Sequence, residues 1–207
     1  MKVAILGGTG SFGRALAARL VARGEDEVVI GSRDPGRARA AAAELAAAGA
    51  ARNDEAARAA DLVVLAVKAD AALATAAEVA AALGDTPVLS VASALVLGRG
   101  GARPDPDARS LAERVQALVR APVVAGLHSV AAANLAAAPP EEDALVCGDD
   151  PDAKALALEL AGRVVAGRAL DAGPLASARA LEGLTAVIVN LNRRYRAHAG
   201  IRVTGVP

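Results

Sequence analysis

Met1-Lys2-Val3-Ala4-Ile5-Leu6-Gly7-Gly8-Thr9-Gly10-Ser11-Phe12-Gly13 is the stretch of this 207-residue chain that decides its fold. Its apolar first half predicts a buried strand over residues 2–6, and an Ala/Leu-rich helical pattern begins after the last glycine. Gly8, Gly10 and Gly13 have the G-x-G-x-x-G spacing between that strand and that helix. The combination predicts a turn that binds a dinucleotide.

Each of these glycines has its own expected role in such a turn. We expect Gly8 to form the tight turn, Gly10 to let the backbone approach a pyrophosphate, and Gly13 to let the helix pack closely on the strand. The phosphates would bind unpaired N–H groups at the helix N-terminus, where the helix dipole favours negative charge. The predicted cofactor contacts in this stretch are Gly8, Thr9, Gly10, Ser11, Phe12 and Gly13.

Composition excludes several other classes of protein. Acidic and basic residues balance at 23 each, and one Phe, one Tyr and no Trp leave little on which nucleobases can stack, so nucleic acid is not an expected partner. The single cysteine, Cys147, and two distant histidines form no disulfide framework and no cluster of metal ligands. The first apolar run has only five residues, too few for a signal peptide or a membrane span, and we expect a cytoplasmic protein with no membrane partner.

Short Val/Leu/Ile runs alternate with Ala-rich helical stretches along the chain, which predicts an α/β fold with a mostly parallel sheet. The predicted strands are residues 2–6, 27–31, 50–52, 61–67, 87–91, 122–126, 145–148 and 168–171. The predicted helices are residues 11–23, 35–48, 53–60, 69–83, 107–120, 152–163 and 175–198. Asp34 is the expected N-cap of the second helix because Pro35 follows it, and Asn53 or Asp54 is the expected cap of the third.

Two long segments, residues 92–106 and the last predicted helix, have patterns of their own. Residues 92–106 contain three glycines and two prolines without periodicity, which predicts an irregular loop, either functional or mobile. The last helix has apolar residues at helical spacing, so it must pack on the sheet or on a second subunit. These apolar residues are Leu181, Leu184, Val187, Ile188 and Leu191.

The second strand ends in a sequence that favours NADP over NAD. NAD-binding domains usually have an acidic residue there for the ribose 2′-hydroxyl, whereas this chain has Ser32-Arg33. A hydroxyl and a guanidinium suit a 2′-phosphate, and Arg37 lies one helical turn further on. Asp34 is the alternative ribose carboxylate, but Pro35 favours its role as a helix cap.

Segments spread over the whole chain resemble the F420-dependent NADP reductases. These segments are Gly7-Gly8-Thr9-Gly10, Gly31-Ser32-Arg33, Leu127-His128-Ser129-Val130, Cys147-Gly148-Asp149-Asp150, Asp171-Ala172-Gly173-Pro174-Leu175, Leu181-Glu182-Gly183-Leu184-Thr185, Asn192-Arg193-Arg194-Tyr195 and Gly200-Ile201-Arg202-Val203. The resemblance implies a Rossmann-type, doubly wound domain over residues 1–207. Residues 145–207 would form a small α/β extension with a long last helix that completes the second-substrate pocket and contacts the partner of a homodimer.

The resemblance also implies the reaction, reversible hydride transfer between NADPH and the deazaflavin coenzyme F420, and its residues. His128 would position the acceptor or stabilise charge on it, with no nucleophile required. The implied NADP contacts include Thr9, Ser11, Ser32, Arg33, Arg37, Ala66 and Val67. The implied second-substrate contacts are Ala92, Ser93, His128, Ser129, Val130 and Leu175.

Two turns depart from the family pattern. Lys68-Ala69 replaces a Pro-Trp pair after the fourth strand, and Val91 to Leu95 lacks the proline-containing turn that follows the fifth. Both changes lie where nicotinamide or deazaflavin is expected. The alternatives to the F420 reaction are therefore an NADPH-dependent reductase of a small imine or ketone and a non-catalytic NADP-binding sensor.

Overall fold

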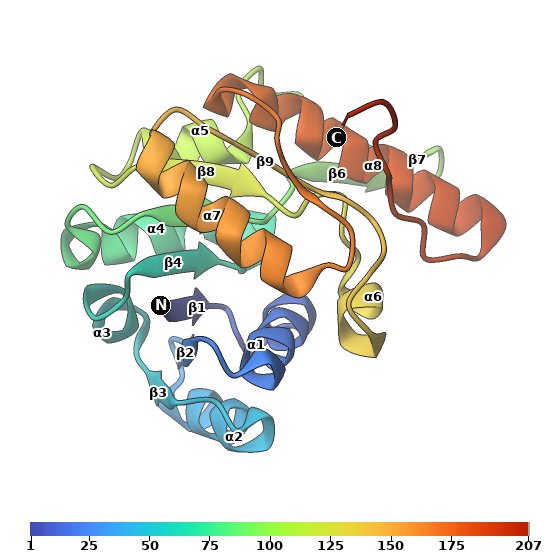
Figure 1. Ribbon diagram of the computed structural model, residues 1–207. Helices are drawn as coiled ribbons and strands as arrows, with labels where there is room; N and C mark the ends of the chain where they lie inside the picture. Colours follow the sequence, from blue (N-terminus) through green and yellow to red (C-terminus); the bar gives the residue numbers. More distant parts are fainter. Residues whose placement is uncertain (207) are drawn as a thin grey trace.

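The computed structural model describes residues 1–206, and its centre is an eight-stranded sheet (Figure 1). The strand order is β10-β9-β8-β5-β4-β1-β2-β3, with β9 antiparallel to β8, β10 parallel to β9 and all other pairings parallel. The strands are β1 (Lys2–Leu6), β2 (Glu27–Gly31), β3 (Gly49–Ala51), β4 (Leu62–Leu65), β5 (Val88–Ser90), β8 (Val123–Gly126), β9 (Ala144–Gly148) and β10 (Ala169–Asp171). The predicted α/β class with a mostly parallel sheet is confirmed.

Helices cover both faces of the sheet. They are α1 (Ser11–Arg23), α2 (Pro35–Leu45), α3 (Asn53–Arg58), α4 (Ala69–Leu83), α5 (Leu111–Gln116), α6 (Ala132–Ala137), α7 (Pro151–Val164), the 3-10 turn η1 (Leu175–Ser177) and α8 (Ala178–Tyr195). Val3 and Ile5 of β1 pack with α1, α2 and α7, whereas Ala4 and Leu6 pack with α3, α4 and α5. Successive side chains of a strand point to opposite faces of a sheet, so the side chains of β1 contribute alternately to two hydrophobic cores.

Local sequence explains where several helices begin and end. The Asp34 carboxylate accepts hydrogen bonds from the N–H groups of Gly36 at 2.8 Å and Arg37 at 3.1 Å, which confirms the predicted N-cap of α2. Asp150 caps α7 in the same way before Pro151. α1 ends at Gly24, whose φ of 71° places it in the left-handed region that glycine adopts readily.

Several predicted boundaries were wrong. Residues 92–106 contain an antiparallel hairpin, β6 (Leu95–Gly98) and β7 (Gly101–Pro104), rather than an irregular loop. The helix predicted over residues 107–120 is only α5, which begins at Leu111 with Ser110 as N-cap and Glu113 completing a capping box. α2 ends at Leu45, and the next residue, Ala46, adopts a left-handed conformation. α3 begins at Asn53 with Arg52 as its N-cap, so Asn53 is inside the helix and does not cap it.

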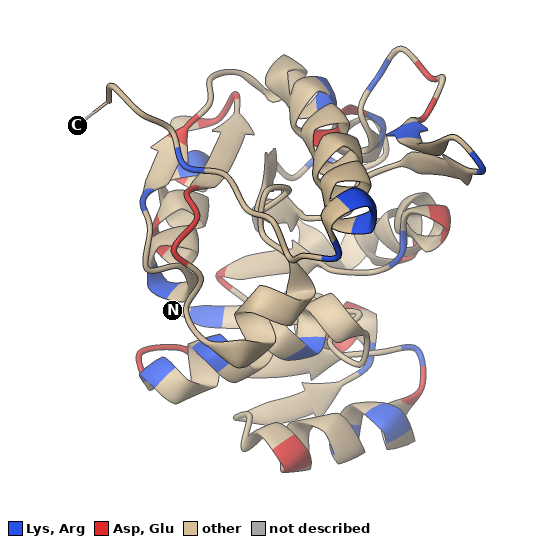
Figure 2. Cartoon of the chain, turned by 90° about the vertical axis from the view of Figure 1, so that its right-hand side faces the viewer, with Lys and Arg blue, Asp and Glu red and all other residues tan. Residues whose placement is uncertain are grey.

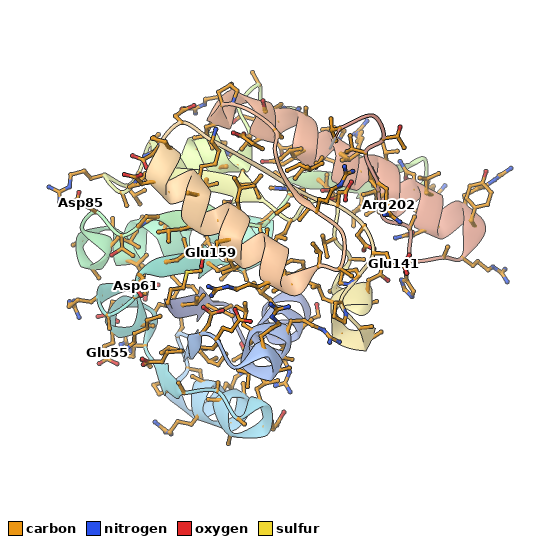
Figure 3. All side chains as sticks on the ribbon, viewed as in Figure 1. Glu55, Asp61, Asp85, Glu141, Glu159 and Arg202 are labelled. Atoms are coloured by element: carbon orange, nitrogen blue, oxygen red, sulfur yellow. The ribbon has the colours of Figure 1, made fainter. Side chains whose placement is uncertain are left out.

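One edge of the sheet collects the segments that were expected to bind ligand. β1 and β4 are neighbours, and the chain continues from them toward opposite ends of the sheet, which makes a crevice at their carboxyl ends. The turns that follow β1, β2, β4, β5 and β8 all meet at this edge. Asp61 and Asp85, labelled in Figure 3, precede β4 and β5 and lie at the opposite edge. Within residues 1–206, no helix is both long and apolar enough to cross a membrane.

Candidate functional site

A cleft of about 1320 Å³ opens at the carboxyl edge of the sheet. The residues that line it are Gly7, Thr9, Gly10, Ser11, Phe12, Ser32, Arg33, Asp34, Arg37, Asn53, Ala66, Val67, Lys68, Ala69, Asp70, Ala71, Ala74, Thr75, Val91, Ala92, Ser93, Leu95, Leu127, His128, Val130 and Thr185. They come from the turns after five parallel strands, from the starts of α3, α4 and β6, and from α8. The structure therefore brings the predicted nucleotide segments and most of the predicted acceptor segments to one cavity.

The glycine turn after β1 is tight at Gly7 rather than at Gly8. Gly7 has a φ of +87°, and a Cβ there would lie 2.7 Å from the carbonyl oxygen of Ala66. Only glycine fits that combination of backbone angle and close approach. Gly8 is buried against Ile30 and does not line the cleft, so its predicted role in the tight turn belongs to Gly7.

The other two glycines have the positions expected of them. Gly10 is the N-cap of α1 and lines the cleft, and no side chain caps the helix there. The first-turn N–H groups of α1, which have no partner within the helix, are therefore available to an anion. A Cβ at Gly13 would lie 2.6 Å from the carbonyl oxygen of Gly7, so Gly13 serves the packing of helix on strand and does not line the cleft.

The corner between β2 and α2 is basic. Ser32, Arg33 and Arg37 all line the cleft, and both arginines are exposed (Figure 2 shows the basic residues of α2). Among residues 1–206, neither guanidinium has an ion-pair partner. The Asp34 carboxylate is engaged by two N–H groups of α2. Two unpaired cations beside a hydroxyl favour a phosphate at this corner.

Ala66 and Val67, the predicted contacts after β4, form the wall opposite the basic corner. The same wall continues into the first two turns of α4, which line the cleft with small side chains at Ala71 and Ala74. Lys68 is exposed and lines the cleft beside them. The small apolar side chains of this wall suit an aromatic ring, with Lys68 and Asp70 at its exposed margin.

Four of the six predicted acceptor contacts line the cleft: Ala92, Ser93, His128 and Val130. Two predicted contacts do not. Ser129 is buried, and its hydroxyl donates to the carbonyl oxygen of Asp143 at 2.9 Å. Leu175 is buried in the core, where its N–H donates to the Asp149 carboxylate at 2.9 Å.

His128 lies in the cleft wall in an unusual state. The residue is 5% exposed, and neither ring nitrogen makes a hydrogen bond of good geometry within the described chain, although the backbone of Ala92 lies close enough to the ring to act on its pKa. Burial lowers the pKa of the imidazole from 6.5 to about 4, because the charged form loses its hydration, and the Ala92 backbone opposes part of this shift. The preceding Leu127 has a φ of +64°, which is rare for a bulky side chain and marks the point where the chain turns out of β8 into the cleft.

α8 holds the acceptor side together. The Thr185 hydroxyl lies 2.8 Å from that of Ser93 and 3.0 Å from the carbonyl oxygen of His128. The buried Glu182 carboxylate accepts hydrogen bonds from the N–H groups of Leu111 at 2.6 Å and Ala94 at 3.3 Å. Burial raises the pKa of Glu182, while these two bonds oppose the rise. The turns after β5 and β8 are thus fixed to one helix.

Sequence reasoning did not single out Asn53, Leu127 or Thr185 as site residues. Leu127 and Thr185 belong to segments that carry the family resemblance, so a closer comparison of those segments could have found them. Nothing in the local sequence distinguishes Asn53, because its burial depends on the sheet. Among residues 1–206, no group of three or more His, Cys, Asp or Glu side chains is arranged to hold a metal ion.

Comparison with known proteins agrees with this geometry. A family model described as "NADP oxidoreductase coenzyme F420-dependent" matches residues 2–94. The chain is 37% identical to the F420-dependent NADP reductase of Methanothermobacter thermautotrophicus, over all of this chain and 96% of that protein. It is 33% identical to the F420-dependent NADP reductase of Methanocaldococcus jannaschii, over all of this chain and 99% of that one.

A solved structure extends the match to three dimensions. The crystal structure of a candidate F420-dependent NADP reductase from Arthrobacter sp. FB24 superposes with a TM-score of 0.86 at 27% identity. The superposition covers 99% of this chain and 100% of that one. The glycine turn, the basic corner and the acceptor wall therefore lie in a chain whose full length matches one family in sequence and in fold. The chain belongs to the family of F420-dependent NADP reductases.

Proposed function

We propose that this protein is an NADPH:F420 oxidoreductase that transfers hydride between NADPH and coenzyme F420 in either direction. One observation carries the proposal: a single cleft has an anion-binding corner at one end and a small-residue slot with a neutral histidine at the other. NADPH supplies the hydride and the deazaflavin ring accepts it. The residues present fit both compounds, since buried polar groups without partners line both ends of the cleft.

At the nucleotide end, the chain supplies binding and orientation. The N–H groups of the first turn of α1 and the side chains of Thr9 and Ser11 face a pyrophosphate. Ser32, Arg33 and Arg37 bind the 2′-phosphate, and this corner selects NADPH over NADH. Ala66 and Val67 form one wall of the slot. Gly8, Phe12 and Gly13 shape the turn.

At the acceptor end, the chain supplies an apolar slot and one hydrogen-bonding ring. Ala92, Ser93 and Val130 shape the slot, and the hydrogen bond between the Thr185 and Ser93 hydroxyls holds Ser93 in place. His128 is neutral at physiological pH, so one ring nitrogen donates and the other accepts. It positions the acceptor ring and stabilises charge that develops there by donating a hydrogen bond, without becoming a cation. Hydride transfer then depends on proximity and orientation.

The direct test is a spectrophotometric assay with purified protein, NADPH and oxidised F420. The absorbance band of oxidised F420 should disappear as NADPH is consumed, and NADH should be a much poorer donor. Tight NADPH binding with no change in the F420 band would reject the reaction and favour the sensor alternative. Turnover of a small imine or ketone in place of F420 would favour the alternative of an NADPH-dependent imine or ketone reductase.

We also propose a homodimer that forms through the last helix, within the C-terminal extension over residues 145–207. Leu181 and Ile188 of the predicted apolar stripe are buried inside the subunit, whereas Val187, Leu191 and Tyr195 are exposed at a spacing of four residues along α8. Four-residue spacing places them on one face, which supports contact with a second copy. The sole cysteine, Cys147, is a buried free thiol, which supports work in the reducing cytoplasm.

A further inference from the structure

Asn53 is a buried amide that hydrogen-bonds nothing in the described chain. It is the first residue of α3, its side chain is 3% exposed, and its Oδ1 is enclosed without a partner. The Nδ2 atom also makes no hydrogen bond within residues 1–206 but, unlike Oδ1, it is not enclosed. An enclosed amide oxygen without a partner is costly, and native proteins almost always satisfy such groups.

The amide forms part of the cleft wall at the nucleotide end. A Cβ on Gly31 would lie 3.2 Å from Asn53 Oδ1, and Gly31 is the last residue of β2, immediately before the Ser32-Arg33 corner. Asn53 therefore lies directly beneath the corner that binds the 2′-phosphate. His128 and the acceptor slot lie at the other end of the cleft. The ligand group within reach of Asn53 belongs to the adenosine half of the dinucleotide.

We propose that Asn53 binds the adenosine half of NADPH through its side-chain amide. The Nδ2 group, which is not enclosed, offers two donors to the acceptor atoms of an adenine ring edge or of a ribose hydroxyl. Bound nucleotide gives these donors a partner that the free protein does not supply. This inference rests on the NADP assignment of the cleft and adds a contact that neither the glycine turn nor the basic corner supplies.

Asn53→Leu tests the proposal because leucine has almost the same shape and no polar atoms. NADPH affinity, measured by calorimetry or by NADPH fluorescence without F420, should fall about tenfold. The melting temperature of the ligand-free protein should stay the same or rise, because a buried group without a partner has been removed. Asn53→Ala serves the same test if leucine prevents folding.

Ser90→Ala is the matched control. Ser90 on β5 is buried and its hydroxyl is also without a partner, but it does not line the cleft. Its substitution should leave NADPH affinity unchanged. Unchanged NADPH affinity in both Asn53 variants would overturn the proposal. For Asn53→Leu, a loss of affinity accompanied by a fall in the melting temperature of the free protein would also overturn it, since that result indicates a structural role.

The hypoxanthine analogue of NADPH, which lacks the adenine amino group, distinguishes the two adenosine groups. If Asn53 binds the base edge, wild-type protein should bind the analogue more weakly than NADPH, and Asn53→Leu should abolish that difference. If it binds the ribose, Asn53→Leu should weaken both ligands equally. Because binding is measured without F420, failure of the F420 reaction would leave these outcomes unaffected, and unchanged affinity would leave the reaction unaffected.

Discussion

Burial decides the protonation state of His128. A histidine in water is half protonated near pH 6.5, but here desolvation lowers the pKa to about 4. Proton binding is therefore weaker in the folded state than in the unfolded state, and acid favours unfolding through this residue. The resulting loss in the free energy of unfolding is absent above about pH 6.5 and reaches its full size below about pH 4. The shift corresponds to roughly 3 kcal/mol.

His128→Asn should therefore reduce the acid sensitivity of the fold. The wild-type free energy of unfolding should fall by roughly 3 kcal/mol more than that of the variant as the pH drops through this window. Urea unfolding of both proteins at several pH values measures the difference. Parallel pH profiles for the two proteins would contradict a neutral, buried imidazole.

Arg33→Ala should weaken NADPH binding by about ten- to a hundredfold, because a charge-assisted bond to a phosphate is lost. NADH has no 2′-phosphate, so its affinity should change little. Arg39→Ala is the control, since Arg39 is exposed on the same helix but does not line the cleft. Titration of each variant with NADPH and with NADH measures both affinities. Equal losses of affinity for the two nucleotides would contradict the assignment of Arg33 to the 2′-phosphate.

Residues at strand ends were predictable because the glycine spacing and the Ser32-Arg33 corner are local patterns. Gly7 shows the limit of such patterns. Its left-handed backbone and its contact with Ala66 depend on how β4 lies beside β1, which spacing does not reveal. Asn53 escaped notice for the same reason, because the burial of its Oδ1 depends on how α3 lies beside Gly31 at the end of β2.

Among the elements, local pattern missed the short helix α6 and the hairpin β6–β7, neither of which is among the predicted helices and strands. The Asn190 side chain of α8 accepts from the Ala102 N–H at 2.7 Å and donates to the Ala102 carbonyl at 2.8 Å. Asn190 lies 88 residues from Ala102 in the sequence, and the hairpin is not part of the eight-stranded sheet. Two-stranded hairpins are marginal alone, so a distant helix decides whether these residues are ordered. The alternating strands and helices of the main sheet, in contrast, could be predicted from local sequence alone.

Asn190→Leu should loosen the hairpin without unfolding the sheet. Hydrogen exchange of the β6–β7 amides should accelerate about tenfold through the loss of the two Ala102 bonds. Because Leu95 lines the cleft, the KM for F420 should rise while NADPH affinity stays the same. Asn192→Ala is the control, since Asn192 binds the N–H of Ala199 in the tail. Unchanged exchange in Asn190→Leu would show that the hairpin is held by other contacts.

At the scale of the whole molecule, α8 connects two surfaces. Its buried side holds the acceptor turns through Glu182 and Thr185, and its outer side carries Val187, Leu191 and Tyr195. Figure 1 shows the helix lying across the carboxyl edge of the sheet beside the hairpin. Sequence periodicity predicted that this helix packs on something, but it could not separate the two faces, since that requires the position of the sheet.

Leu191→Glu should convert the proposed dimer into a monomer, because a charge on an apolar contact face opposes association. Sedimentation velocity measures the change. Leu118→Glu is the control, since Leu118 is exposed at a site away from α8. A wild-type protein that sediments as a monomer, or a Leu191→Glu protein that still dimerises, would contradict the proposed interface.

The central claim is that both ligands meet in one cleft and exchange hydride directly. It is tested most directly by NADPH that carries deuterium at the transferred position of the nicotinamide. Direct transfer within the cleft places the label at the acceptor carbon of reduced F420, with no loss to water. Reduced F420 without the label, or no reduction at all by protein that binds NADPH, would rule out direct transfer.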